Sequence, residues 1–157
     1  MIYKSCCFTG HRIISDDFDL IRKEVYKNVQ SLISQGTENF ILGGAIGFDS
    51  LCAKIIVTMK KKYPKIRLML ILPCMDQDKK WNSEQKAEYR FILDNADSIK
   101  YISQKYITGC MHQRNREMVD NSDCVIAYCK RDFGGTHFTV SYAKSQKKQI
   151  INIGKTI

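Results

Sequence analysis

The chain has 157 residues, of which 44% are hydrophobic, and its 25 Lys and Arg exceed its 16 Asp and Glu to give a net charge of +9. This length is typical of one ordinary domain, so we expect a single domain over residues 1–157. No apolar stretch is long enough to span a bilayer and no signal-peptide pattern is evident, so we expect a cytoplasmic protein without a membrane partner.

Apolar runs of strand length alternate with segments of helical periodicity along the whole chain. In chain order, the expected elements are a strand at 3–8, a helix at 17–35, a strand at 39–42, a helix at 48–59, a strand at 66–72, a helix at 83–96, a strand at 98–103, a helix at 111–121, a strand at 123–129, a helix at about 136–147 and a strand at 149–153. Pro64 is expected to end the second helix and Pro73 the third strand.

Six strands separated by helices are typical of an α/β fold with a doubly wound, mainly parallel sheet flanked by helices. Right-handed crossovers place every strand-to-helix loop at one edge of such a sheet, where ligands bind. Seven of the nine glycines fall in these loops: Gly10, Gly43, Gly44, Gly47, Gly109, Gly134 and Gly135. Glycine permits close approach to the backbone, so this distribution favours a ligand at that edge.

The segment "GGAIGFD" at 43–49 joins a predicted strand to a predicted helix. Backbone N–H groups at the start of a helix suit a phosphate. Its spacing differs from G-x-G-x-x-G, and no Gly-Lys-Ser/Thr of a P-loop follows. We favour anion binding for this loop. Asp49 has two interpretations, since it either caps its own helix or accepts a bond from a ribose hydroxyl.

The segment "DFGGTHFTV" at 132–140 has the same character. Gly134 and Gly135 permit a tight turn, and the hydroxyl of Thr136 either caps the following helix or contacts a phosphate oxygen. The alternative is an ordinary strand-to-helix turn.

Two further segments supply cations. In "FTGHR" at 8–12, Arg12 offers a forked donor for phosphate or carboxylate, and His11 is a weaker candidate. In "MHQRNREM" at 111–118, helical spacing directs Arg114 toward the loop edge, with Asn115 beside it.

The seven cysteines show no C-x-x-C spacing, and the three histidines do not complete a zinc pattern. We expect free thiols and no metal site. The lysine runs at 60–62, 79–80 and 147–148 fall at predicted helix ends, which favours a solvated basic surface. Clustered cations also suit phosphates, so nucleic acid remains an alternative partner.

These segments together resemble those of YpsA-like proteins of the SLOG superfamily, which includes the LOG and DprA/Smf proteins. The resemblance rests on "CCFTGHR", "GGAIGFDSLCA", "YPKIRLMLILPCMDQDKKW", "QRNREMVDNSDCVIAYC" and "GGTHFTVSYA", which cover most of the chain. It implies a Rossmann-like domain with a nucleotide or nucleotide-derived ligand at the glycine loops. It also implies that a homodimer is an alternative to a monomer.

LOG proteins cleave nucleoside 5′-monophosphates, and "MHQRN" and "FGGTHFT" are similar to two of their motifs. The resemblance places Arg114 at their functional arginine and Thr139 at their catalytic glutamate. Threonine has no charge with which to stabilise an oxocarbenium-like state. We therefore favour binding without cleavage. A hydrolase with Asp49 as its acid and Arg114 beside it is the alternative.

The expected function is thus binding of a nucleotide or nucleotide-sugar, as a sensor or regulator, with no cofactor required. A LOG-like phosphoribohydrolase and a DprA-like single-stranded nucleic-acid binder are the alternatives. The residues expected to bind the ligand are Gly10, His11, Arg12, Gly43, Gly44, Ala45, Gly47, Phe48, Asp49, Arg114, Asn115, Gly134, Gly135, Thr136 and Thr139.

Overall fold

The computed structural model of the protein describes residues 3–156. Its six strands form one parallel sheet in the order β4-β3-β2-β1-β5-β6. The strands are β1 (Ser5–Gly10), β2 (Asn39–Leu42), β3 (Arg67–Cys74), β4 (Ser98–Ser103), β5 (Cys124–Tyr128) and β6 (Gln149–Asn152). This confirms the predicted Rossmann-like, doubly wound architecture.

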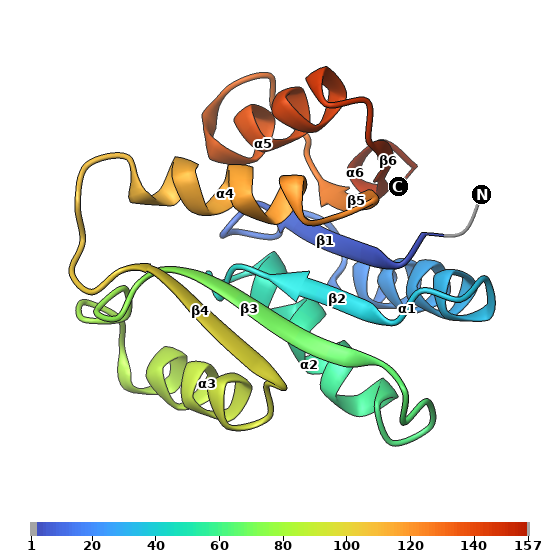
Figure 1. Cartoon of the computed structure of the whole chain (residues 1–157), viewed down its shortest axis with the longest axis horizontal. Helices are drawn as coiled ribbons and strands as arrows, with labels where there is room; N and C mark the ends of the chain where they lie inside the picture. The colour runs from blue at the N-terminus through green and yellow to red at the C-terminus, as the bar shows by residue number, and fades with distance from the viewer. Residues whose placement is uncertain (1–2, 157) are drawn as a thin grey trace.

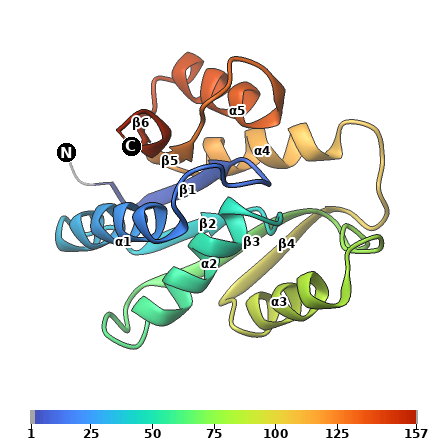
Figure 2. The same ribbon diagram turned by 180° about the vertical axis from the view of Figure 1, so that it is seen from behind.

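The helices alternate with the strands, as the periodicity predicts. They are α1 (Phe18–Ser34), α2 (Phe48–Met59), α3 (Ser83–Asp94), α4 (Cys110–Asp120), α5 (Gly134–Ser145) and the short α6 (Ile153–Thr156). Figure 1 and the reverse view in Figure 2 show α1, α2 and α3 on one face of the sheet and α4 and α5 on the other. None of the helices described for residues 3–156 is long and apolar enough to cross a bilayer.

Alternation of side chains along each strand builds one hydrophobic core on each face. In β1, Cys6 and Phe8 point into the larger core under α1, α2 and α3, whereas Cys7 points into the core under α4 and α5. All seven cysteines are buried free thiols.

Four strands differ from their predicted ranges by one or two residues at an end: β1, β3, β5 and β6. The later ends of β1 and β3 follow from strand pairing. Strand β1 begins at Ser5, and it runs through Gly10 because Phe8 to Gly10 pair with Ile126 to Tyr128 of β5. Strand β3 continues through Pro73 to Cys74. Strand β2 ends opposite Leu70, so beyond that point β3 has a neighbour on one side only, and the missing N–H of proline is tolerated.

The strand order changes direction at β1, which lies inside the sheet between β2 and β5. Strands β2, β3 and β4 add on one side of it, whereas β5 and β6 add on the other. The loops that follow β1 and β5 therefore diverge at a topological switch point. Open α/β sheets bind ligands in the crevice outside this point.

Candidate functional site

A cavity of about 410 Å³ lies at the carboxyl edge of the sheet, at this switch point. It is lined by the loops after β1, β2 and β5, by the first turns of α2 and α5, and by one face of α4. Its lining includes ten of the residues expected from the sequence: Gly10, His11, Arg12, Ala45, Asp49, Arg114, Asn115, Gly134, Gly135 and Thr136. Parallel topology brings these separate motifs together, because each follows or faces the same end of the sheet.

The first turn of α5 presents open backbone to the cavity. Helix α5 begins at Gly134, earlier than predicted, and its N-cap Phe133 makes no side-chain capping bond. A Cβ added at Gly134 or Gly135 would meet no atom of the described chain within 4 Å. Gly134 has a φ of 90°, which glycine adopts readily, whereas Gly135 needs no such angle. This turn can therefore accept an anion at the positive end of the helix dipole.

Two exposed arginines flank this turn. Arg12 follows β1 and Arg131 follows β5, and both line the cavity. The guanidinium of Arg131 lies over the ring of Phe133, 5.6 Å from its centroid. Phe133 is 62% exposed, and Ile13, which also lines the cavity, is 80% exposed. The lining of the cavity thus includes exposed cationic and exposed apolar side chains.

Arg114 is fixed by the protein rather than free in the cavity. It is buried, its Nε donates to Asn115 Oδ1 at 2.7 Å, and its Nη1 donates to the carbonyl oxygen of Gly43. Burial lowers the pKa of Arg114, and the nearby charge of Asp49 opposes that decrease. Arg114 supplies positive potential to the cavity wall and anchors the loop after β2.

Asp49 is a buried carboxyl group in the wall of the cavity, with 5% of its surface exposed. Burial raises its pKa from 3.8 to about 6, although Arg114, the Ala45 N–H and Arg12 all favour the charged form. Its Oδ2 accepts from the backbone N–H of Ala45 at 3.3 Å. The bond therefore closes the loop before α2 and does not cap the first turn of that helix.

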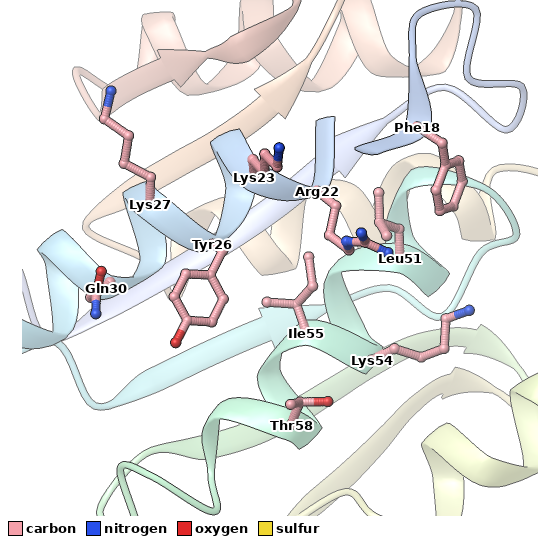
Figure 3. A pocket seen from close by; sticks show the side chains of 10 residues that line it. All are labelled: Phe18, Arg22, Lys23, Tyr26, Lys27, Gln30, Leu51, Lys54, Ile55 and Thr58. Carbon is pink, nitrogen blue, oxygen red and sulfur yellow. The ribbon is translucent and has the colours of Figure 1, made fainter. Parts of the chain in front are cut away.

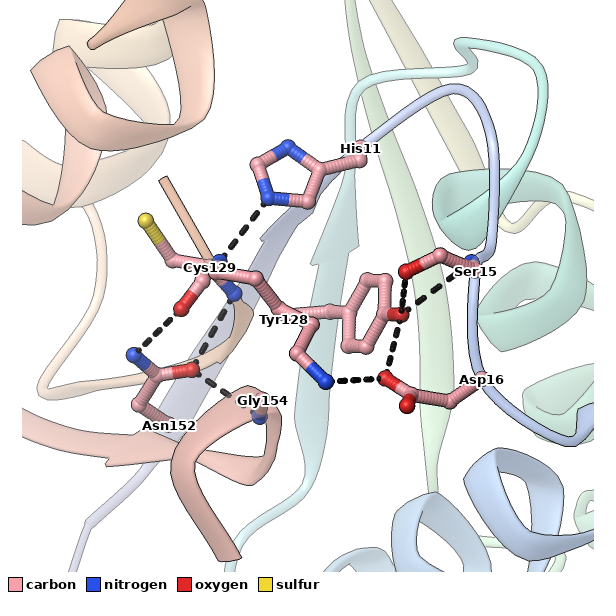
Figure 4. A network of polar contacts seen from close by, with 8 residues as sticks. His11, Ser15, Asp16, Tyr128, Cys129, Asn152 and Gly154 are labelled. Atoms are coloured by element: carbon pink, nitrogen blue, oxygen red, sulfur yellow. Dashed lines mark hydrogen bonds and ion pairs between the residues drawn. The ribbon is translucent and has the colours of Figure 1, made fainter. Parts of the chain in front are cut away.

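His11 and Tyr128 hold the loop after β1 against the end of β5 (Figure 4). The Nε2 of His11 accepts from the backbone N–H of Lys130 at 2.9 Å, so the neutral ring carries its proton on Nδ1. Burial and, less strongly, the charge of Arg131 lower the pKa of His11. The buried Tyr128 hydroxyl donates to Asp16 at 2.7 Å. These two bonds fix His11 and Asp16, which lie on either side of Arg12 in the sequence.

A second set of bonds holds the other side of the β5 end. Figure 4 shows the side chain of Asn152 against the backbone of Cys129 and Gly154. Asn152 donates to the Cys129 carbonyl at 3.0 Å and accepts from the Cys129 N–H at 3.1 Å. The segment that leads into the glycine turn of α5 is therefore anchored at its start.

Five of the expected residues do not line the cavity: Gly43, Gly44, Gly47, Phe48 and Thr139. The glycines among them make room for other parts of the protein. A Cβ at Gly47 would lie 2.2 Å from the backbone oxygen of Arg12, and one at Gly43 would lie 2.6 Å from Nη1 of Arg114. A Cβ at Gly44 would lie 2.5 Å from Leu72. All three glycines of "GGAIGFD" thus serve loop packing.

Phe48 and Thr139 have internal roles. Phe48 is buried and stacks on Tyr128, with ring centroids 5.7 Å apart. Thr139 is fully buried, and its Oγ1 donates to the carbonyl oxygen of Gly135 at 2.9 Å. This bond ties the hydroxyl to the first turn of α5, so in this conformation it does not reach the cavity.

The structure also adds residues that sequence reasoning did not select. They are Thr9, Ile13, Met111, Met118, Arg131 and Phe133. Phe133 lies within the second glycine motif and Arg131 directly precedes it, so that motif was the signal that could have identified both. Met111 and Met118 lie on the same helix as Arg114, but their spacing is equally typical of a core face.

Comparisons with known proteins agree with this architecture. The YpsA family model, described as the YspA SLOG family, matches residues 3–154. The SPbeta prophage-derived protein YoqJ of Bacillus subtilis is 30% identical over 129 residues, which are 74% of this chain and 75% of YoqJ. The UPF0398 protein BH1768 of Halalkalibacterium halodurans is 26% identical over 132 residues, which are 82% of this chain and 70% of that protein.

Two solved structures share the fold at low sequence identity. DNA processing protein A of Helicobacter pylori, in a structure that concerns single-stranded DNA binding, is 19% identical with a TM-score of 0.67 over 93% of this chain. DNA processing protein A (DprA) of Streptococcus pneumoniae is 16% identical with a TM-score of 0.65 over 94% of this chain. The chain spans 63% and 52% of the length of these two proteins.

Proposed function

Because the chain belongs to the YspA SLOG family, we propose that its cavity binds a nucleotide or nucleotide-sugar and that the protein acts as a sensor or regulator. The observation that carries this proposal is the open glycine turn at Gly134 and Gly135, which meets a cavity flanked by Arg12 and Arg131. The volume of about 410 Å³ is within the range of small-molecule sites.

Each part of a nucleotide has a counterpart in this arrangement. The phosphate would receive backbone N–H groups from the first turn of α5 and charge-assisted bonds from the two exposed arginines. The base would stack against Phe133, whose ring is exposed at the mouth. The Asp49 carboxylate would accept from a ribose hydroxyl deeper in the cavity.

A thermal-shift panel of nucleotides and nucleotide-sugars tests the proposal. A ligand at a hundred times its dissociation constant adds about 2.7 kcal/mol, which raises the Tm of a protein of this size by about 5–10 °C. Arg12→Ala removes one exposed donor and should reduce the shift, whereas the exposed Arg90→Ala on α3 should leave it unchanged. Arg114 is unsuitable for this purpose because its removal disturbs the loop it holds.

The alternative of a phosphoribohydrolase has one specific observation in its favour. A pKa raised to about 6 suits Asp49 to proton transfer near neutral pH, and the group lines the cavity. Release of free base from nucleoside 5′-monophosphates, lost in Asp49→Asn with the fold intact, would support hydrolysis. Absence of release over the whole panel would count against it.

Single-stranded nucleic acid is the second alternative. It is motivated by the net charge of +9 and by the shared fold of the Helicobacter pylori protein, whose structure concerns single-stranded DNA binding. Binding of this kind weakens steeply with salt because counterions are released. Titration of a labelled oligonucleotide at two salt concentrations separates it from binding of a mononucleotide. Affinity for the oligonucleotide alone would make it the preferred function.

A further inference from the structure

A groove of about 490 Å³ lies between α1 and α2 (Figure 3). Leu51 and Ile55 of α2 form its floor and are 3% and 7% exposed. Phe18, at one end of the groove, and Tyr26, further along α1, both point toward α2. Phe18 is 50% exposed, which is costly for an aromatic side chain without a further contact.

The ionisable side chains that line the groove are all cations apart from the phenol of Tyr26. They are Arg22, Lys23, Lys27 and Lys54. Arg22 forms an ion pair with Asp19 of its own helix. Lys54 forms one with Glu88 of α3. Lys23 and Lys27 are exposed and form no ion pair with any residue of the described range 3–156. The groove thus combines an apolar floor with a positive rim.

We propose that this groove docks an acidic amphipathic helix of a partner protein. Such a helix would lay its apolar side chains along Phe18, Ile55 and Tyr26 and place its carboxylates beside Lys23 and Lys27. The interaction is independent of the nucleotide cavity, whose lining shares no residue with the groove.

The charge and shape of the groove favour this occupant over two others. A second copy of the chain, paired about a two-fold axis at this groove, would bring cations against cations. A membrane surface attracts cations but is too flat to reach a recessed floor between two helices. An acidic amphipathic helix is narrow enough to contact the apolar floor, and its carboxylates complement the cationic rim.

The test uses a fluorescein-labelled peptide with leucines at helical spacing on one face and glutamates on the other. We expect it to bind the full chain in fluorescence anisotropy. Lys23→Glu with Lys27→Glu should weaken binding by at least about tenfold. Lys79→Glu with Lys80→Glu, a matched reversal of two lysines outside the groove, should change affinity by less than about threefold.

Phe18→Ala tests the apolar half of the groove. Its side chain is half exposed, so the fold should persist, as circular dichroism would verify, while peptide affinity falls by about tenfold. Three results would overturn the proposal. In the first, the acidic peptide does not bind the wild-type chain. In the second, the Lys23/Lys27 variant and the Lys79/Lys80 variant bind the peptide with equal affinity. In the third, the groove substitutions abolish a dimer of the chain seen by sedimentation, or abolish its binding to anionic vesicles, and leave peptide binding unchanged.

Discussion

Replacement of Asp49 by Asn should stabilise the protein at neutral pH. The carboxyl group is buried, and burial raises its pKa from 3.8 to about 6 despite the nearby charges of Arg114 and Arg12. Asn removes the charge but keeps an oxygen that can accept from the Ala45 N–H. A charged group held at a cost to stability is typical of a functional position.

The size of the effect follows from proton linkage. Between pH 3.8 and 6 the folded state binds more protons at Asp49 than the unfolded state does. The stabilisation by the protonated group is therefore complete below about pH 4 and is lost as the pH rises through 6. At pH 7.5 the loss amounts to about 3 kcal/mol, whereas at pH 4.5 it is about 1 kcal/mol.

Urea denaturation and thermal melts of wild type and Asp49→Asn between pH 4.5 and 8 measure this difference. The variant should melt about 6–12 °C higher at pH 7.5 and about 2–4 °C higher at pH 4.5. Asp94→Asn, on the surface of α3, is the control and should change stability by less than about 0.5 kcal/mol throughout. A variant less stable than wild type at pH 7.5, or a difference that does not vary with pH, would refute the reasoning.

Three further substitutions test the site. Gly135→Ala should leave the Tm within about 2 °C, because a Cβ there meets no atom, yet it should abolish the thermal shift caused by nucleotides. Gly47→Ala should cost at least about 2 kcal/mol in urea denaturation, because φ is 83° and the Cβ would lie 2.2 Å from the oxygen of Arg12. Tyr128→Phe removes the hydroxyl bonded to Asp16 and should cost about 2 kcal/mol, and an unchanged Tm would contradict the role assigned to that bond.

The order of the helices and strands could be predicted because the spacing of apolar residues that indicates each element depends only on that segment of the sequence. The predicted range 39–42 coincides with β2 and 98–103 with β4, since both strands are bounded by polar or turn residues. The limits of β1 and β3 could not be predicted in this way. They depend on where neighbouring strands begin and end, which is a property of the sheet and not of the segment.

The clustering of the site residues could also be predicted, because a parallel sheet brings its strand-to-helix loops to one edge. The sequence could not distinguish glycines that are open to the cavity from glycines that pack against the protein. Gly47 and Gly135 follow similar patterns, but only the three-dimensional structure shows that one abuts the backbone of Arg12 and the other is open. That Asp49 does not cap α2 could likewise be learned only from the structure, in which its Oδ2 accepts from the Ala45 N–H.

The most direct test of the central claim is a two-dimensional amide NMR titration with a nucleoside 5′-monophosphate. Phosphate held by the first turn of α5 predicts large shifts of the Gly134, Gly135 and Thr136 amide resonances, with smaller shifts at Arg12. In Gly135→Ala these shifts should vanish while the rest of the spectrum is retained. Shifts confined to other surfaces, or none at saturating nucleotide, would show that the glycine turn does not bind the phosphate.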